Sequence, residues 1–284
     1  MMNGAVCPAA NGKLDGEAEM KRRDFLVGLG SAAGLMSAGC ASVMPCSKKR
    51  QLIEVKTYVC ANAAKRDALI KVFDEALIPA LNRQGINNVG VFWASAKENG
   101  DNATYETNVF VVIPHPCSGT FLEGDRRLLV DEQYVKDAAV LFNAPMKEPL
   151  YDSCSSLLLR GFETCPQVQK VTDSPDRVMQ LRVYNSYTTE RNIKKIAMFE
   201  EGGEIAIFRA CGMAPVFFGQ ALAGDKLPNL TYMLGFASKA ALDEGWGKFR
   251  NHPDWLKLKA DEQYKDTANK IVNIVMRPSK GSQL

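Results

Sequence analysis

Hydrophobic and polar residues alternate along several short stretches of the chain, and between those stretches hydrophobic residues recur every three or four positions. Alternation is typical of a half-buried strand, whereas the longer period is typical of a helix with one buried face. In the second half these patterns predict a strand, a helix, two strands, helices and a strand over residues 179–184, 188–210, 215–222, 230–236, 239–264 and 271–276. The predicted order is therefore β-α-β-β-α-β.

The first half has the same predicted order. Its strand, helix, two strands, helix and strand cover residues 52–59, 62–85, 89–94, 105–113, 125–142 and 155–162. Pro79 is expected to loosen the first helix, because proline lacks the amide hydrogen that a helix interior uses. Residues 97–102 are expected to form a polar loop. The inner face of the second helix is predicted to consist of Leu128, Leu129, Tyr134, Val135, Ala138 and Leu141.

Short matches between the two halves indicate an internal duplication. Residues 55–58 (Val-Lys-Thr-Tyr) match residues 181–184 (Leu-Arg-Val-Tyr) 126 positions later, and residues 91–93 (Val-Phe-Trp) match 216–218 (Val-Phe-Phe) 125 positions later. Residues 131–134 (Asp-Glu-Gln-Tyr) recur letter for letter at 261–264. Because the matches fall in corresponding predicted elements, they favour a repeat with loop insertions over chance.

One β-α-β-β-α-β unit forms a four-stranded antiparallel sheet with two helices on one face, which is the ferredoxin-like arrangement. The other sheet face is apolar and needs a partner. We therefore expect an α+β protein in which two ferredoxin-like repeats pack as an intramolecular dimeric-type α/β barrel. Residues 51–165 are predicted to form the first, degenerate repeat and residues 178–278 the second, joined by a polar linker over 172–177.

The segment 1–50 is predicted to direct export. Arg22 and Arg23, followed by one polar and two apolar residues, resemble the twin-arginine export motif, and a Gly/Ala-rich run over 25–38 follows. A short amphipathic helix that opens a domain is the alternative. Met20 directly precedes the basic run, so the true start codon is open.

Cys40 is predicted to carry a lipid anchor. Residues 37–40 (Ser-Ala-Gly-Cys) resemble a lipobox, although that motif usually has Leu in the place of Ser37. Ordinary signal-peptide cleavage near the same position is the alternative. We expect a periplasmic or membrane-anchored lipoprotein whose only membrane contact is the anchor, because no later stretch has the roughly 18 apolar residues of a membrane helix.

The net charge and the cysteine content limit which binding partners and which disulfides can be expected. A formal net charge of +3, with basic residues scattered among acids, does not favour a nucleic-acid partner. Of the eight cysteines, Cys46, Cys60, Cys117, Cys154, Cys165 and Cys211 lie beyond the predicted export segment. Export permits disulfides, but six cysteines leave the pairing open, and Cys60 in an apolar strand can equally be a buried free thiol.

The second half resembles the NIPSNAP family. The resemblance rests on residues 179–184 (Met-Gln-Leu-Arg-Val-Tyr), on Ala-Ala-Leu at 240–242, on Trp246, and on residues 249–255 (Phe-Arg-Asn-His-Pro-Asp-Trp). The first repeat lacks this ending. The resemblance implies membership of the dimeric α+β barrel superfamily. That superfamily also contains small monooxygenases and haem-degrading enzymes that use the barrel interior as a pocket.

The candidate ligand-binding residues are Arg182, Tyr184, Trp93, Phe218, Trp246, His252 and Trp255. Arg182 and Tyr184 share a strand face, as do Lys56 and Tyr58. If that face points into the barrel, a buried arginine needs an anionic partner; if it points outward, Arg182 is a solvated residue. The apolar residues Leu181 and Val183 favour the outward alternative.

The aromatic and histidine candidates also have structural alternatives. Trp246, Phe249 and Trp255 recur at near-helical spacing and either pack the helices onto the sheet or form an aromatic wall for an apolar ligand. His252 precedes Pro253, which favours a position at a helix junction over a ligand role. No catalytic residues, metal ligands or cofactors are predicted, because no set of titratable groups has the spacing of a known site.

Two functions follow as hypotheses. The first is a non-catalytic module that binds a small apolar ligand or an envelope protein. The alternative, which the superfamily resemblance implies, is a monooxygenase-like or haem-handling enzyme. In both cases the site is expected in the space between the two halves and at the aromatic ending over residues 246–255. Whether the chain forms a homodimer is open.

Overall fold

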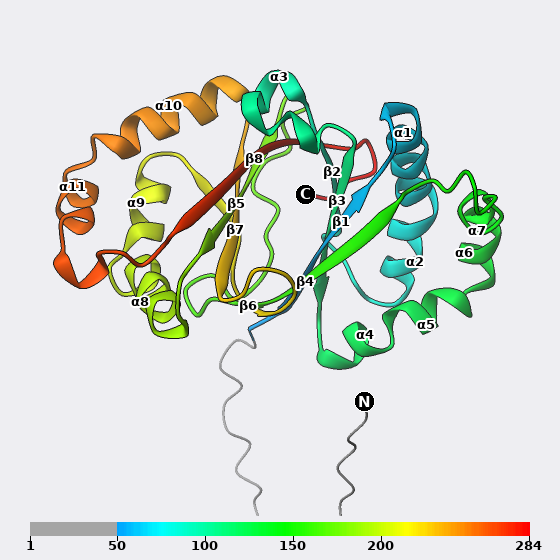
Figure 1. Cartoon of the computed structure of the whole chain (residues 1–284), viewed down its shortest axis with the longest axis horizontal. Helices are drawn as coiled ribbons and strands as arrows, with labels where there is room; N and C mark the ends of the chain where they lie inside the picture. Colours follow the sequence, from blue (N-terminus) through cyan, green and yellow to red (C-terminus); the bar gives the residue numbers. More distant parts are fainter. Residues whose placement is uncertain (1–49) are drawn as a thin grey trace, which may run out of the picture. The chain divides into compact units, whose positions relative to one another are not determined.

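Eight antiparallel strands form a closed barrel in the computed structural model, which describes residues 50–284 (Figure 1). The strands are β1 (Leu52–Val59), β2 (Gly90–Ala94), β3 (Asn108–His115), β4 (Ser153–Gly161), β5 (Val178–Asn185), β6 (Ala214–Ala223), β7 (Asn229–Phe236) and β8 (Lys270–Pro278). Around the barrel they follow the order β1-β3-β2-β8-β5-β7-β6-β4. Each half thus supplies a sheet with the ferredoxin-like order, β4-β1-β3-β2 and β8-β5-β7-β6, which confirms the predicted fold.

The two sheets join at two places, where β2 pairs with β8 and β4 pairs with β6. Because β2 is short, the side chain of Asn99 extends the first join by bonding the backbone N–H and C=O of Val275 at 2.8 and 2.9 Å. At the second join Gly161 lies opposite Gly219. A Cβ atom at Gly219 would lie 2.7 Å from Cβ of Leu159, so glycine is what lets the two strands close here.

Hydrophobic side chains from both halves fill the barrel interior. Ten of them, each 5% exposed or less, are Ile53, Val55, Phe92, Phe110, Leu159, Met179, Leu181, Phe217, Met233 and Met276. Their removal from water stabilises the closed barrel and couples the two halves through one shared core. The interior between the halves is therefore a packed core, and the cavities of the described residues that we discuss below lie outside it, contrary to expectation.

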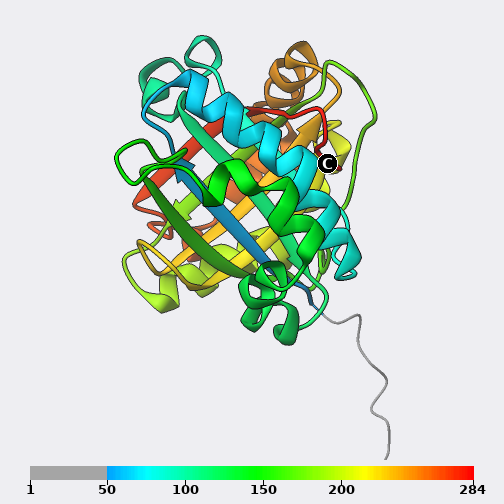
Figure 2. The same ribbon diagram turned by 90° about the vertical axis from the view of Figure 1, so that its right-hand side faces the viewer.

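Helices cover the outside of the barrel on two opposite sides (Figure 1). The first half contributes α1 (Ala63–Val72), η1 (Phe73–Leu77), α2 (Ile78–Arg83), α4 (Ser118–Leu122), α5 (Gly124–Leu129), α6 (Glu132–Asp137) and α7 (Ala139–Phe142). The second contributes α8 (Thr189–Glu200), α9 (Glu204–Ala210), α10 (Lys239–Arg250), α11 (Pro253–Lys259) and η3 (Glu262–Tyr264). Figure 2 shows α1 crossing the outer face of the first-half strands.

Two predicted helices are broken into shorter ones. The helix predicted over 188–210 ends at Glu200 and restarts at Glu204, because Gly203 takes a left-handed conformation with φ +80°. The helix predicted over 125–142 is α5, α6 and α7, and the side chain of Asp131 caps α6 by accepting a bond from the backbone N–H of Tyr134. Its predicted inner face is wrong in part, since Leu129 and Val135 are 61% and 39% exposed.

The remaining differences are local. The segment 97–102, predicted as a loop, includes parts of α3 (Ala96–Asn99) and η2 (Gly100–Tyr105). The first helix loosens into the π-helical η1 just before Pro79, as predicted. Within residues 50–284 no helix is long and apolar enough to cross a membrane. The predicted export and lipidation residues Arg22, Arg23 and Cys40 lie outside the described residues.

Candidate functional site

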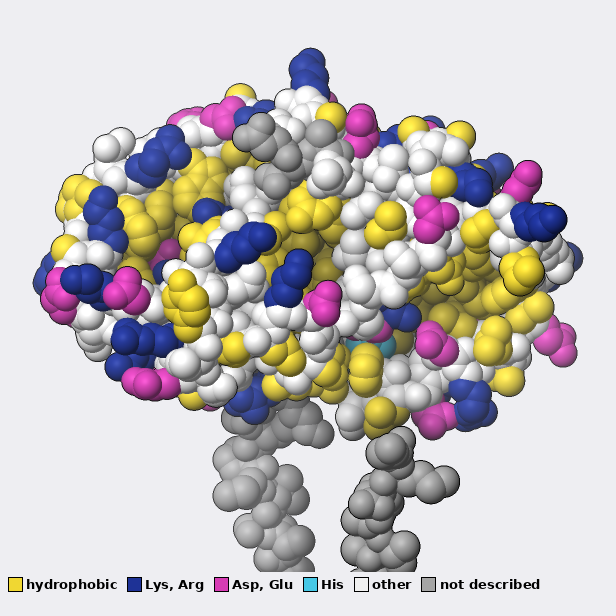
Figure 3. Space-filling view, viewed as in Figure 1, with side chains coloured by type: hydrophobic (Ala, Val, Ile, Leu, Met, Phe, Trp, Pro, Cys, Tyr) yellow, Lys and Arg dark blue, Asp and Glu magenta, His cyan; other side chains and the backbone are white. Residues whose placement is uncertain are grey.

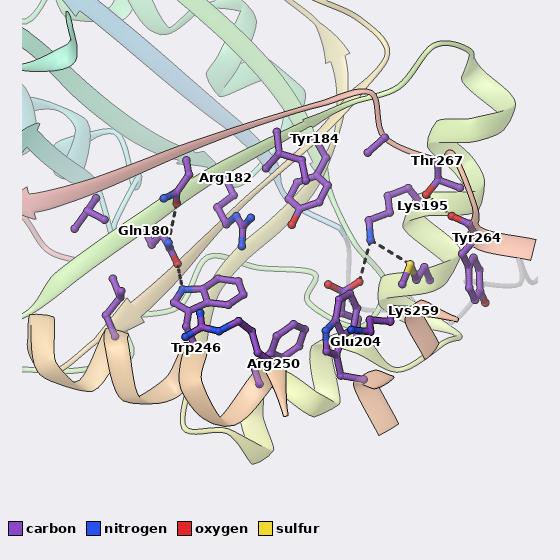
Figure 4. Close-up of a pocket in the computed structure, with 18 of the residues that line it drawn as sticks. Gln180, Arg182, Tyr184, Lys195, Glu204, Trp246, Arg250, Lys259, Tyr264 and Thr267 are labelled. Carbon is purple, nitrogen blue, oxygen red and sulfur yellow. Dashed lines mark hydrogen bonds and ion pairs between the residues drawn. The ribbon is translucent and has the colours of Figure 1, made fainter. Parts of the chain in front are cut away.

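A cavity of about 760 Å³ lies between the outer face of the second-half sheet and the helices that cover it (Figures 3 and 4). β5 and β8 form its floor, and α8, α10 and α11 contribute most of its walls. Side chains of β5 point alternately to the two faces of the sheet. Leu181 therefore packs inside the barrel, while Gln180, Arg182 and Tyr184 line the cavity.

A chain of hydrogen bonds connects the floor of this cavity to α10. The indole N–H of Trp246 donates to Oε1 of Gln180 at 2.6 Å, and the Gln180 side-chain amide donates to Oδ1 of Asn273 at 2.7 Å (Figure 4). Gln180 is only 4% exposed, so both ends of its amide are satisfied in a buried place. These bonds fix the plane of the Trp246 ring against the sheet.

Arg182 packs against that ring. Its guanidinium carbon lies 4.5 Å from the centroid of Trp246 and 5.3 Å from that of Tyr184, which are cation–π distances. Its Nε is buried without a hydrogen-bond partner among the described residues, whereas the hydroxyl of Tyr232 and the charge of Glu204 act on the guanidinium and raise its pKa. The cavity thus contains a positioned cation with unused hydrogen-bonding capacity.

A buried ion pair lies at the other end of the cavity. Nζ of Lys195 on α8 is 3.1 Å from Oε2 of Glu204 on α9 and 3.1 Å from Sδ of Met198 (Figure 4). Both charged side chains are almost fully buried, at 7% and 2% exposure. Burial raises the pKa of Glu204 although Lys195 acts in the opposite direction. Lys195 is therefore occupied by its partners and is not a free base.

Tyr184 completes the polar part of the floor, and Tyr232 lies buried beside it. The hydroxyl groups of Tyr184 and Tyr232 lie 3.4 Å apart, and burial raises the pKa of both. They remain protonated near neutral pH and serve as hydrogen-bonding groups. Neither can act as a phenolate base under those conditions.

Aromatic rings form the outer wall. The centroid of Phe249 lies 4.6 Å from that of Trp255, 4.7 Å from that of Phe208 and 5.4 Å from that of Trp246. Phe249 is buried, whereas Trp246 and Trp255 are only partly buried and line the cavity. The rings therefore both pack the helices and present an apolar wall to the cavity.

The structure brings together four of the seven predicted site residues: Arg182, Tyr184, Trp246 and Trp255. Phe218 lies outside the cavity lining and stacks on Tyr232 with centroids 4.6 Å apart. His252 caps α11, where its Nδ1 accepts the backbone N–H of Asp254 at 3.3 Å. Trp93 belongs to the first half, under the guanidinium of Arg66 at 5.0 Å.

The outward direction that Leu181 and Val183 favoured for the Arg182 face is confirmed, but the solvated side chain expected with it is not. Its strand face does point out of the barrel, but the helices cover that face, so the side chain is mostly enclosed and not freely solvated. Sequence reasoning also missed Gln180, Lys195 and Glu204. Gln180 could have been found by extending the alternation of Tyr184 and Arg182 by two positions. Nothing in the sequence indicated that Lys195 and Glu204 meet.

A second cavity of about 590 Å³ lies at the corresponding place in the first half, where Figure 3 shows hydrophobic side chains in a hollow on the right. Glu54, Lys56 and Tyr58 on β1 line it, 126 positions before Gln180, Arg182 and Tyr184. Oε2 of Glu54 lies 3.2 Å from Nε2 of His115, and Oε1 accepts the hydroxyl of Ser156 at 2.6 Å. Nζ of Lys56 is 3.6 Å from Oε1.

The contacts of Glu54 predict that the free energy of unfolding depends on pH in the acid range. Burial raises the pKa of Glu54, but the bonds from His115 and Ser156 and the charge of Lys56 lower it more, so its pKa lies below the usual 4.5. A carboxyl group with a lowered folded-state pKa stabilises the fold above its unfolded pKa, and this stabilisation is lost as the pH falls through the folded pKa. We expect Glu54→Gln to be less stable than the parent at neutral pH and to lose less stability on acidification below pH 4.5. Urea unfolding from pH 7 to 3 measures this; equal acid slopes for the two proteins would count against it.

The side chains around the second-half cavity do not match the ligands that a metal ion or a haem requires. The described residues contain no group of three or more His, Cys, Asp or Glu side chains that could hold a metal ion. Haem needs an axial donor, and the cavity of the second half has no lining histidine or cysteine among the described residues. Sδ of Met198 is engaged by Lys195, and the Tyr184 hydroxyl by Tyr232. This donor set does not fit an axially ligated haem.

The cysteines of the described region are free thiols. Cys60, Cys165 and Cys211 are buried, and Cys117 and Cys154 are exposed. Of the two alternatives left open for Cys60, the structure shows the buried free thiol. None of the five lines the cavity of the second half, so they do not contribute to its chemistry.

The fold is similar to that of several solved structures. A Lactobacillus acidophilus protein described as a "putative monooxygenase" has a TM-score of 0.54 at 11% identity, over 81% of this chain and 94% of its own. A "putative monooxygenase" from Fusobacterium nucleatum has a TM-score of 0.52 at 9% identity, over 81% and 93%. A NIPSNAP-like domain protein from Burkholderia xenovorans has a TM-score of 0.33 at 16% identity, over 37% and 87%.

The family comparison concerns the half that contains the larger cavity. No curated protein matches the chain. The NIPSNAP family model matches residues 179–283, which span the strands and helices from β5 to β8. The chain therefore has the fold of a dimeric-type α+β barrel, and its residues 179–283 match the NIPSNAP family as a domain.

Proposed function

We propose that the NIPSNAP domain binds a small organic anion with a planar apolar body in the cavity between β5 and α10. The observation that carries this proposal is the position of Arg182, which is held over Trp246 in the cavity with a buried Nε that has no hydrogen-bond partner among the described residues. A carboxylate or phenolate would satisfy that nitrogen and neutralise the charge. The aromatic wall would take up the apolar body.

The balance of charges around the cavity supports an anionic ligand. Lys195 is paired with Glu204, Lys239 with Asp243, and Glu98 with Arg277. Among the remaining charged residues of the lining, three are basic and one is acidic: Arg182, Arg250, Lys259 and Asp266. The unpaired charge is thus mainly positive, and field lines concentrate in a cleft with apolar walls.

Binding of 2-naphthoate tests the proposal. Arg182→Gln keeps a polar side chain but removes the charge, and we expect it to weaken binding by about tenfold to a hundredfold, the range of a charged hydrogen bond. Isothermal titration calorimetry on the full chain measures this. Arg209→Gln, exposed on α9 and outside the cavity lining, is the matched control and should bind as the parent does. Equal affinity of Arg182→Gln and the parent would overturn the proposal.

Oxygenation of the bound molecule is a second candidate function. The similar barrels described as putative monooxygenases motivate it, and the enclosure of Arg182 by Trp246 and Tyr184 favours it. A cation in an enclosed apolar site stabilises the anionic form of a substrate. Consumption of dissolved oxygen with 3-hydroxy-2-naphthoate, a phenol that also carries the carboxylate expected at Arg182, is the result that would support it if Arg182→Gln abolishes that consumption. No oxygen uptake with this phenol would favour simple binding.

We also propose that the protein acts outside the cytoplasm, delivered by the twin-arginine motif at Arg22 and Arg23 and anchored through Cys40. The motifs alone support this. Mass spectrometry of the mature N-terminus tests it: a diacylated Cys40 as the first residue is the expected result. An unmodified start at or after residue 41 would exclude the anchor, and an intact residue 1 would exclude export.

A further inference from the structure

The first-half cavity has a polar end that its own residues do not complete. His115 is 3% exposed and lines the cavity, and its Nε2 lies 3.2 Å from the carboxylate of Glu54. In the neutral imidazole that nitrogen carries the proton, because the carboxylate can only accept. Nδ1 is then an acceptor, and it has no hydrogen-bond partner among the described residues. A buried acceptor without a donor is costly, and the hydroxyl group of a ligand or of a water molecule would satisfy it.

A donor faces the same carboxylate. Nζ of Lys56 donates a long hydrogen bond to Oδ1 of Asp125 at 3.5 Å and lies 3.6 Å from Oε1 of Glu54. Its ammonium group has three N–H donors and can give one to a ligand. The polar end of the cavity therefore offers one free acceptor and one free donor.

The charges around this end exclude most charged ligands. A carboxylate ligand would lie beside Glu54 and Asp125 and has no hydrogen to donate to Nδ1 of His115, and an ammonium ligand would lie beside Lys56 and cannot accept a hydrogen bond from its Nζ. Like charges at such distances are unfavourable. A hydroxyl group fits instead, since it donates one hydrogen bond and accepts another without adding charge.

The rest of the cavity is apolar. Its walls come from helices on both sides of the opening and include Phe73, Leu77, Leu81, Leu128, Tyr134 and Tyr151. Tyr58 packs between Phe73 and Tyr151, with centroids at 4.9 and 5.0 Å. A ring or chain without polar groups would contact the aliphatic and aromatic parts of these side chains.

We infer that the first-half cavity is a second binding site, which takes an uncharged apolar alcohol or phenol whose hydroxyl donates to Nδ1 of His115 and accepts from Nζ of Lys56. The two related cavities then differ in ligand class. The second-half cavity selects an anion through Arg182, and the first-half cavity selects a neutral hydroxyl compound. The second-half cavity has the neutral Gln180 where the first-half cavity has Glu54. The negative charge of Glu54 opposes an anionic ligand, and this accounts for the difference in ligand class.

The test compares three probes on the full chain: 2-naphthol, 2-methylnaphthalene, which replaces the hydroxyl by a methyl group, and 2-naphthoate. We expect 2-naphthol to bind the parent about tenfold more tightly than 2-methylnaphthalene, the effect of one satisfied buried acceptor. His115→Phe should remove that preference while it leaves 2-naphthoate binding unchanged. Titration calorimetry and competition between the probes give the affinities.

Gly124→Leu provides a second variant that does not touch the Glu54–His115 pair. Gly124 is buried and lines the cavity, and a Cβ atom there meets no atom within 4 Å, so a leucine would occupy ligand space. It should weaken 2-naphthol binding strongly. Gly247→Leu on α10, where a Cβ atom also meets open space outside both cavity linings, is the matched control.

The outcomes separate this site from the one in the NIPSNAP domain. Loss of 2-naphthol binding in Gly124→Leu with 2-naphthoate binding retained supports the second site. Unchanged 2-naphthol binding in both His115→Phe and Gly124→Leu overturns it. Loss of 2-naphthol binding in Arg182→Gln alone also overturns it, because the phenol would then bind in the second-half cavity. Failure of 2-naphthoate to bind would count only against the proposed function.

Discussion

Glu204→Gln is expected to lower the free energy of unfolding by about 3–5 kcal/mol, the usual cost of leaving one member of a buried ion pair without its partner. Glu204 is 2% exposed, and its Oε2 is 3.1 Å from Nζ of Lys195. Because glutamine has nearly the same shape as glutamate, the loss of stability comes from removing the charge and not from creating a cavity. Lys195 would keep only its contact with Met198 and the aromatic faces of Tyr184 and Phe199.

A double variant shows how much of that loss comes from leaving the charge of Lys195 unpaired and how much from losing the ion pair itself. Lys195→Met combined with Glu204→Leu removes both charges and should recover most of the lost stability, since an apolar pair of similar volume often replaces a buried ion pair without cost. Glu244→Gln is the control, because Glu244 pairs with Lys248 on the surface of α10 and should change stability little. Urea unfolding gives all three values. A Glu204→Gln variant as stable as the parent would show that the pair is not buried as described.

Phe217→Ala is the second substitution with a large expected effect, about 3–5 kcal/mol, as for other fully buried aromatic residues. Phe217 is 0% exposed and belongs to the cluster inside the barrel that includes Ile53 and Val55 of the first half. We expect the loss to appear in both halves together, because both line the same core. Its control is Tyr187→Ala in the same half, at a residue that is 72% exposed.

Native-state hydrogen exchange can follow the two halves separately. In Phe217→Ala the backbone amides of β1 and β3 in the first half should lose protection by the same free energy as those of β5 and β7. Chemical unfolding should remain a single transition. Protection lost only in the second half would show that the halves are independent domains and that the closed barrel is not one cooperative unit.

The order of elements could be predicted from the sequence because strands and helices leave different periods in it. The alternation over β1 and β5 and the recurrence of Asp-Glu-Gln-Tyr at residues 131 and 261 were sufficient for the duplicated ferredoxin-like fold. The helix breaks were harder to see. They depend on a single left-handed glycine at position 203 and on a side-chain cap at Asp131, local effects that an average over hydrophobic positions hides.

The candidate site could be predicted only in part. Arg182 and Tyr184 were identified because they share a strand face, and Trp246 because it belongs to aromatic residues that recur at near-helical spacing. Whether that face was solvated, buried in the barrel or covered by helices depends on tertiary packing, which one sequence does not contain. The pairing of Lys195 with Glu204 and of Glu54 with His115 joins different elements in the fold. Such contacts leave no local pattern.

A crystal structure of the full chain with 2-naphthoate tests the central claim most directly. We expect the naphthalene ring between α10 and β5, beside Trp246, with its carboxylate within hydrogen-bonding distance of the Arg182 guanidinium. The same site should have a lower occupancy in crystals of Arg182→Gln soaked at the same concentration, in line with the weaker binding expected of that variant. A naphthoate bound elsewhere, with Arg182 making no contact to it, would contradict the proposal that this cavity of the NIPSNAP domain selects an organic anion.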